Sequence, residues 1–140
     1  MISDVTINLY AVVVAAAANM ALGSLWYGPL FGKAWMKGMG MDPNMPMDDK
    51  KKKEGMKAMM WMVPLSLLTA YVLAHFVDYT VSVTWSEGMQ AGFWIWLGFQ
   101  LTMVIQSVLF EGKKKEVAVI NAAYQLAGLM LMGGILAVWA

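Results

Sequence analysis

Four long apolar stretches limit what this chain can fold into more than any other feature of its sequence. They run over about residues 7–27, 59–77, 90–110 and 117–139, and none contains lysine. Each is close to the roughly 20 residues that an α-helix needs to cross about 30 Å of hydrocarbon. Within them, His75 is the only side chain of the Asp, Glu, Lys, Arg or His type. The sequence therefore predicts an all-α integral membrane protein with four transmembrane helices, folded as a single domain over residues 1–140.

The composition agrees with a membrane location and excludes several kinds of site. Hydrophobic residues make up 60% of the chain and charged residues 14%, too few charges for a soluble domain to cover that much apolar surface. Cysteine is absent, which excludes disulfides, thiolate metal sites and cysteine nucleophiles. The single histidine excludes a histidine cage within one subunit. We expect no metal, no cofactor and, with a net charge of +1, no nucleic-acid partner.

The lysines, which are the only basic residues, are distributed unevenly between the loops. Loops that carry lysine lie on the cytoplasmic side of membrane proteins. We therefore expect both lysine-bearing connections to be cytoplasmic and both termini to be outside. The ten lysines all fall between the first and second or the third and fourth stretches: Lys33, Lys37, Lys50, Lys51, Lys52, Lys53, Lys57, Lys113, Lys114 and Lys115.

The first apolar stretch ends in the sequence LWYGPLFGKAW, residues 25–35. Trp26 and Tyr27 are expected at headgroup depth, where amphipathic rings prefer to lie. Pro29 disfavours helical geometry at Gly28 and so ends or kinks the helix. Apolar residues spaced by lysines then predict a short interfacial helix. This helix is either a simple anchor or a cap on the inner face of the bundle.

The connection to the second stretch is rich in methionine. Nine of the 15 methionines lie in residues 36–62, and Asp48 is a plausible N-cap for the helix that follows. Clustered thioethers can bind Cu(I). Cytosolic thiolates would compete for that ion and the nearby lysines would repel it, so methionine as a flexible apolar filler is the preferred interpretation.

Small residues predict where helices pack closely. Gly88 and Gly92 form a GxxxG pair at the outer end of the third stretch. A seam of small or amide residues at a spacing of four runs along the first stretch: Ala11, Ala15, Asn19 and Gly23.

Polar residues inside the stretches define three candidate sites. His75 and Asp78 form an outer pair, either a proton relay or an interfacial hydrogen bond. Asn19, Gln100 and Ser107 are candidates for a polar face at mid-membrane depth. The third candidate is an inner-leaflet polar pocket, in which Glu111 is the only acid and is expected to be buried and bonded to the first or fourth span. Its predicted members are Trp26, Tyr27, Glu111, Asn121, Tyr124 and Gln125. The alternative for this pocket is a network that tethers helix ends.

The sequence resembles the family called domain of unknown function 1761, which consists of bacterial membrane proteins. The resemblance rests on residues 25–35, AYVLAHF (70–76), LFEGKK (109–114), INAAYQL (120–126) and MGGILAVW (132–139). It implies a small four-span protein of a bacterial inner membrane and brings no activity. Members often have histidine where this chain has Gln125.

Two functions remain open from the sequence. Four packed helices leave no aqueous lumen, so a transporter or channel for a small solute or ion would be a homo-oligomer. Its pathway would be lined by Asn19, Gln100, Gln106 and Gln125, with His75 or Glu111 as further candidates. The alternative is a non-catalytic accessory or scaffold protein whose buried amides specify assembly. An enzyme using Glu111 as a base on lipid is disfavoured, because no nucleophile–base–orienter set is present. Membrane lipids are expected partners, and the solute stays open.

Overall fold

The structure, a computed structural model, describes residues 6–46 and 48–139, and all of its regular elements are helices. The prediction of an all-α fold is confirmed. The elements are α1 (Leu9–Leu25), η1 (Trp26–Leu30), α2 (Gly32–Gly38), α3 (Asp49–Tyr79), α4 (Trp85–Ile95), η2 (Trp96–Gln100), α5 (Leu101–Glu111) and α6 (Lys115–Val138). Here η2 is a single wide turn within a continuous rod, whereas η1 contains a kink at Gly28.

Four helical rods are long and apolar enough to cross a membrane. They are α1 with η1, α3, the continuous rod α4–η2–α5, and α6, with 22, 31, 27 and 24 residues. All four exceed the roughly 20 residues that a span requires. The chain therefore has the fold of a multi-pass membrane protein, and the short helix expected after the first span is α2.

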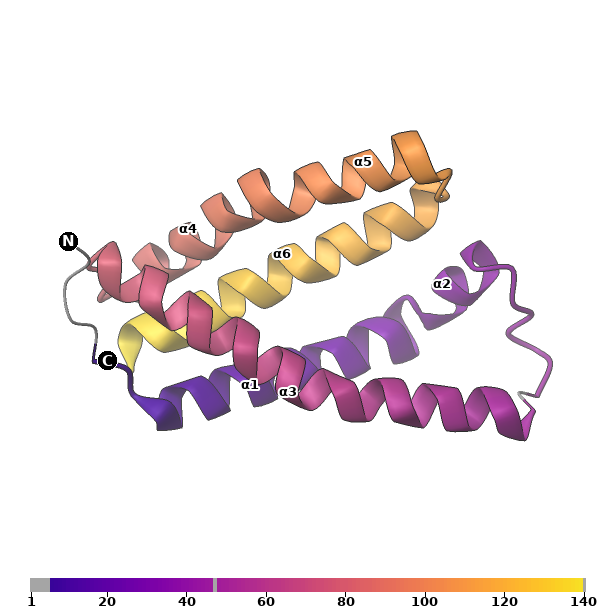
Figure 1. The fold of residues 1–140 in the computed structure, drawn as a ribbon, viewed down its shortest axis with the longest axis horizontal. Helices are drawn as coiled ribbons and strands as arrows, with labels where there is room; N and C mark the ends of the chain where they lie inside the picture. The colour runs from indigo at the N-terminus through magenta and orange to yellow at the C-terminus, as the bar shows by residue number, and fades with distance from the viewer. Residues whose placement is uncertain (1–5, 47, 140) are drawn as a thin grey trace.

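Helix α6 is the centre of the bundle. It packs along α4 on one side and against α1 on another, and α1 in turn packs against α3 (Figure 1). The buried core lies where α1, α3 and α6 meet, and it is built largely of alanine, with Leu73, Leu129 and Met132 as larger members. Small side chains let these helices approach closely.

All ten lysines lie at one end of the bundle. Figure 1 shows α2, the start of α3 and the α5–α6 turn together at that end. The start of α1, the end of α6 and the α3–α4 connection lie at the other. There the Asn8 side chain donates from Nδ2 to the Trp139 carbonyl at 3.2 Å. We call the two ends the lysine end and the terminal end.

Helix ends follow local capping chemistry. Asp48 accepts a hydrogen bond from the Lys51 N–H at 2.8 Å, as expected for the N-cap of α3. Helix α4 begins at Trp85 with a capping box, in which Thr84 accepts from the Glu87 N–H and the Glu87 carboxylate accepts from the Thr84 N–H. The third span therefore begins about one turn earlier than its apolar residues alone predict.

The predicted glycine pair marks a close contact between α4 and α6. A Cβ on Gly88 would collide with the Gly133 carbonyl, and one on Gly92 with the Leu129 carbonyl. These partners are backbone atoms, so no side-chain rearrangement could relieve the clash. The sequence prediction of a packing site at Gly88 and Gly92 is confirmed.

The seam of small residues on α1 is buried over its first three members. Ala11, Ala15 and Asn19 are only 1%, 0% and 8% exposed. Gly23 differs, because a Cβ there would lie 2.8 Å from the Tyr124 hydroxyl and not against a helix backbone. Glycine at this position makes room for a side chain of α6.

The chain turns sharply after the first span, as Gly28 and Pro29 predict. Gly28 leaves the helical region (φ −101°, ψ −106°), and the Phe31 N–H donates back to the Trp26 carbonyl at 2.8 Å. Helix α2 then folds back toward α6, so that Gly38 at its end packs against the Val117 side chain. The helix after the first span thus contacts the bundle and does not merely extend beside it.

Candidate functional site

A hydrogen-bonded network joins three of the four long helices at Asn19. The Tyr124 hydroxyl of α6 points at two oxygens of Asn19, the main-chain carbonyl at 2.9 Å and Oδ1 at 3.2 Å. Asn19 in turn donates from Nδ2 to the Ser66 hydroxyl of α3 at 3.4 Å. Asn19 and Ser66 are both buried, at 8% and 2% exposure. Buried polar groups normally find such partners, so this network specifies how α1, α3 and α6 pack.

A second set of contacts lies one to two turns nearer the lysine end. The Trp26 indole N–H donates to the Ile120 carbonyl at 3.1 Å, and the Tyr27 hydroxyl donates to Asn121 Oδ1 at 2.6 Å. The Tyr27 and Tyr124 rings meet edge to face with centroids 5.3 Å apart. Four residues predicted for the inner pocket are therefore together: Trp26, Tyr27, Asn121 and Tyr124.

The wide turn η1 positions both aromatic residues. The bond from the Phe31 N–H to the Trp26 carbonyl spans five residues and crosses the kink at Gly28. Two consecutive residues, Trp26 and Tyr27, reach successive backbone and side-chain acceptors on α6 from this turn.

Beside this aromatic cluster is a cavity of about 910 Å³, bounded by α1, η1, α2, α3 and α6. Its size lies at the upper end of the roughly 300–1,000 Å³ typical of small-molecule sites. Six methionines line it: Met20, Met36, Met39, Met41, Met59 and Met62. The rings of Tyr27, Trp35 and Tyr124 complete the apolar wall, and Asn121, Lys113 and Lys114 supply polar groups. We call it the methionine cavity.

The methionine cavity contains no carboxylate among its described lining residues. Within residues 6–46 and 48–139, no three His, Asp or Glu side chains gather into a metal-binding group. Sequence reasoning found the methionines as a run along the chain but did not find the cavity. Trp35 of the short helix α2 is half-buried and lines it.

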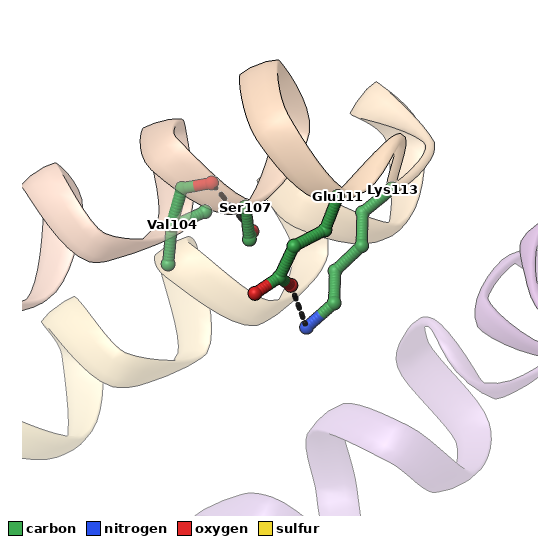
Figure 2. Close-up of polar contacts among 4 residues, drawn as sticks. All are labelled: Val104, Ser107, Glu111 and Lys113. Carbon is green, nitrogen blue, oxygen red and sulfur yellow. Dashed lines mark hydrogen bonds and ion pairs between the residues drawn. The ribbon is translucent and has the colours of Figure 1, made fainter.

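Glu111 does not belong to the inner pocket. Figure 2 shows its carboxylate paired with Lys113 in the following turn, at 3.7 Å, and its side chain is 64% exposed. The prediction that it is buried and bonded to the first or fourth span is wrong. The cause lies earlier in the same rod, because the wide turn η2 shifts the angular positions of all residues after Gln100 relative to a regular helix.

The three residues predicted for the mid-membrane polar face also lie apart from one another. Asn19 is buried against α3 and α6, whereas Gln100 is exposed on the outside of the bundle. The Ser107 hydroxyl donates to the Val104 carbonyl of its own helix at 2.7 Å (Figure 2). In the described part of the chain, no hydrogen bond joins these three residues, so the structure does not bring them together.

Gln125 carries an unusual side-chain oxygen. Its Oε1 is buried and has no hydrogen-bond partner among the described residues. Three residues earlier on α6, the Ala122 carbonyl accepts a hydrogen bond from the Trp96 indole at 2.9 Å. A buried oxygen without a donor is costly, and at Gln125 the described bundle leaves such a hydrogen-bond acceptor unpaired.

The outer residues His75 and Asp78 have different surroundings. His75 Nδ1 lies 2.9 Å from the Tyr71 carbonyl, and since a carbonyl only accepts, Nδ1 carries the proton. The imidazole packs edge to face on the Tyr71 ring, with centroids 4.8 Å apart. Asp78 is exposed and lines a small cavity of about 110 Å³ at the terminal end. No hydrogen bond links the two side chains among the residues that the structure describes.

Comparison with known proteins places the chain in a family. No curated protein and no solved structure matches it. A family's sequence model, described as "Protein of unknown function (DUF1761)", matches residues 10–137. That range holds Asn19, Trp26, Tyr27, Asn121 and Tyr124, the residues that connect α1 and α6. Because the match covers nearly the whole sequence, the chain belongs to the DUF1761 family of proteins of unknown function.

Proposed function

We propose that this protein is a small homo-oligomeric membrane transporter whose solute site is the methionine cavity. The observation that carries this proposal is the cavity itself, a partly open cavity of ligand size lined by three span-length helices and α2. Flexible methionine side chains and a few polar groups make up its wall, which is the usual composition of a small-molecule site.

The lysine-end half of α3 supplies a movable wall. Every residue from Asp49 to Trp61 is exposed, so this half packs little against the rest of the bundle. Segments with few buried contacts open at low cost. Pro64 has no N–H to donate to the Met60 carbonyl, which makes it a natural bending point. Movement of this half about Pro64 would carry Met59 and Met62 away from the methionine cavity and open it.

The outer face of the third rod supports assembly into oligomers. Gln100 and Gln106 are exposed there, and neither amide has a hydrogen-bond partner within the described chain. Amides facing hydrocarbon are unfavourable and normally contact protein or a water-filled path. A second copy of the chain placed against this face would satisfy them.

The lysine distribution supports the orientation that we propose. With all ten lysines at one end, the positive-inside tendency favours an orientation with the lysine end in the cytoplasm and both termini outside a bacterial inner membrane. The methionine cavity would then open toward the cytoplasm.

An accessory or scaffold role is the second candidate. The observation that favours it is the network of Asn19, Ser66 and Tyr124, whose hydrogen bonds are made within the bundle. Such a network stabilises assembly without needing a solute.

Cysteine labelling distinguishes the two functions, because the natural chain contains no cysteine. Ser24 lines the methionine cavity and is exposed, so Ser24→Cys is a mild substitution there. A membrane-impermeant maleimide is added to right-side-out and to inside-out vesicles. A transporter exposes its site alternately, so Ser24→Cys should react from both faces, more slowly from one. Asn44→Cys in the loop should react from a single face. Reaction of Ser24→Cys from one face only would favour the scaffold.

A further inference from the structure

The wall of the methionine cavity is chemically divided. Its methionines come from α1, α2, the following loop and α3, and together with Trp35 they form an apolar chamber. Its charged groups come from the turn before α6, namely Lys113 and Lys114, and α6 adds the amide of Asn121. The described lining also holds the hydroxyl groups of Ser24, Tyr27 and Tyr124. A molecule that satisfies both parts needs an apolar body and a polar group at one end.

The polar end of the cavity is positive. Lys114 has no ion-pair partner among the described residues. Lys113 forms an ion pair with Glu111 at 3.7 Å, but both side chains are more than half exposed. Ion pairs between exposed side chains are weak in water. Two further lysines, Lys33 and Lys37, are carried by α2, which forms the adjacent wall. With no carboxylate in the described lining, a cation would be repelled here and an anion attracted.

The apolar chamber excludes a simple inorganic anion as the preferred ligand. A small hydrated ion gains nothing from thioether and aromatic surface and would lose its hydration. Methionine side chains instead adapt to apolar groups of different shape. The volume of about 910 Å³ would also leave a small ion mostly surrounded by water.

We infer that the methionine cavity binds an amphipathic anion, with its apolar body among the methionines and its acidic group beside Lys113 and Lys114. The inference rests on the proposed function, because it takes the same cavity as the solute site. It adds the chemical class of the solute. One ligand chemistry has two possible sources, a single-chain lipid acid from the membrane or a water-soluble apolar acid from the cytoplasm.

Ligand protection tests the inference without any transport. The purified full-length chain with Ser24→Cys is held in a non-ionic detergent, and the rate of its reaction with N-ethylmaleimide is measured. Dodecanoate stands for the lipid acid, naphthalene-2-carboxylate for the soluble acid and dodecyltrimethylammonium for an amphipathic cation. A ligand at roughly ten times its Kd should slow the reaction about tenfold. We expect this protection from at least one of the two acids and none from the cation.

Lysine variants complete the test. The double variant Lys113→Gln and Lys114→Gln should lose the protection, so that its rate with either acid present equals its own rate without acid. Asn44→Cys, which lies outside the cavity, should be insensitive to all three probes and so controls for detergent effects. Protection by dodecanoate alone indicates that the natural ligand comes from the membrane. Protection by naphthalene-2-carboxylate indicates that it comes from the cytoplasm.

Three results would overturn the inference: no protection by either acid, equal protection by the cation, or full protection retained in the double glutamine variant. Because the assay measures binding in detergent, it is independent of labelling from two membrane faces. If the protein binds the acids but Ser24→Cys reacts from one face only, the inference about the ligand stands and the proposal of transport fails.

Discussion

The hydroxyl of Tyr124 lies 2.9 Å from the main-chain carbonyl of Asn19 and 3.2 Å from its side-chain oxygen. One hydroxyl group thereby connects α6 to α1, and Asn19 extends the connection to Ser66 on α3. The same tyrosine ring forms part of the wall of the methionine cavity. The contact that orders the bundle therefore also shapes the cavity.

Removing this hydroxyl should destabilise the fold. Tyr124→Phe removes the hydroxyl that lies within bonding distance of the Asn19 carbonyl and Oδ1, and losing such a contact typically costs about 1–3 kcal/mol. We expect a lower Tm in detergent, followed by circular dichroism. Tyr10→Phe is the matched control, because Tyr10 is 81% exposed. This variant should have the same Tm as the natural chain. Equal melting of the two variants would mean that Tyr124 and Asn19 are not bonded.

The close contact of α4 with α6 gives a second stability prediction. Gly88→Ala places a methyl group against the Gly133 carbonyl, so the helices must separate. Overpacking of this kind costs about 1–3 kcal/mol, and we expect Tm to fall accordingly. Gly55→Ala is the control, because nothing lies within 4 Å of a Cβ at that position. A Gly88→Ala variant as stable as Gly55→Ala would disprove the close approach.

Gly38 is unsuitable as the control for such an experiment. It is the last residue of α2 and packs against Val117. Helix α2 turns back because of the break at Gly28 and Pro29, and the direction of that turn is set by contacts with α6 that no local pattern encodes.

Much of the fold could be predicted from the sequence because span length and lysine placement are local properties. The small residues of α1 and the pair Gly88 and Gly92 also follow from simple spacing. Four members of the inner pocket were found because Trp26, Tyr27, Asn121 and Tyr124 lie near span ends, where depth alone brings them together.

Positions after Gln100 could not be predicted in the same way. A helical wheel assumes a constant angle per residue, and η2 breaks that assumption within the third rod. Glu111 and Ser107 were therefore assigned to faces that they do not occupy. The methionine cavity was missed for another reason, since it depends on the paths of α2 and α3 after a long connection.

Glu111 should contribute little to stability. Its only described partner is Lys113 at 3.7 Å, and both side chains are largely exposed. Exposed pairs of this kind are weak, so we expect Glu111→Gln to change the free energy of unfolding by less than about 0.5 kcal/mol. The measurement is thermal melting in detergent, with Glu54→Gln, an exposed acid at the start of α3, as the comparison. A marked loss of stability in Glu111→Gln alone would show that the carboxylate has a partner in another span or another copy.

The orientation in the membrane is the last prediction. The ten lysines share one end of the bundle, and moving that end across a membrane would carry every one of them with it. Asn44 is an exposed residue of the lysine end and Ser86 an exposed residue of the terminal end. Ser86 is a better reporter than Ser82, which is buried and bonded to Thr80 at 2.7 Å. In intact bacterial cells a membrane-impermeant maleimide should label Ser86→Cys, and it should label Asn44→Cys only after permeabilisation. Labelling of Asn44→Cys in intact cells would reverse the topology and place the opening of the methionine cavity outside the cell.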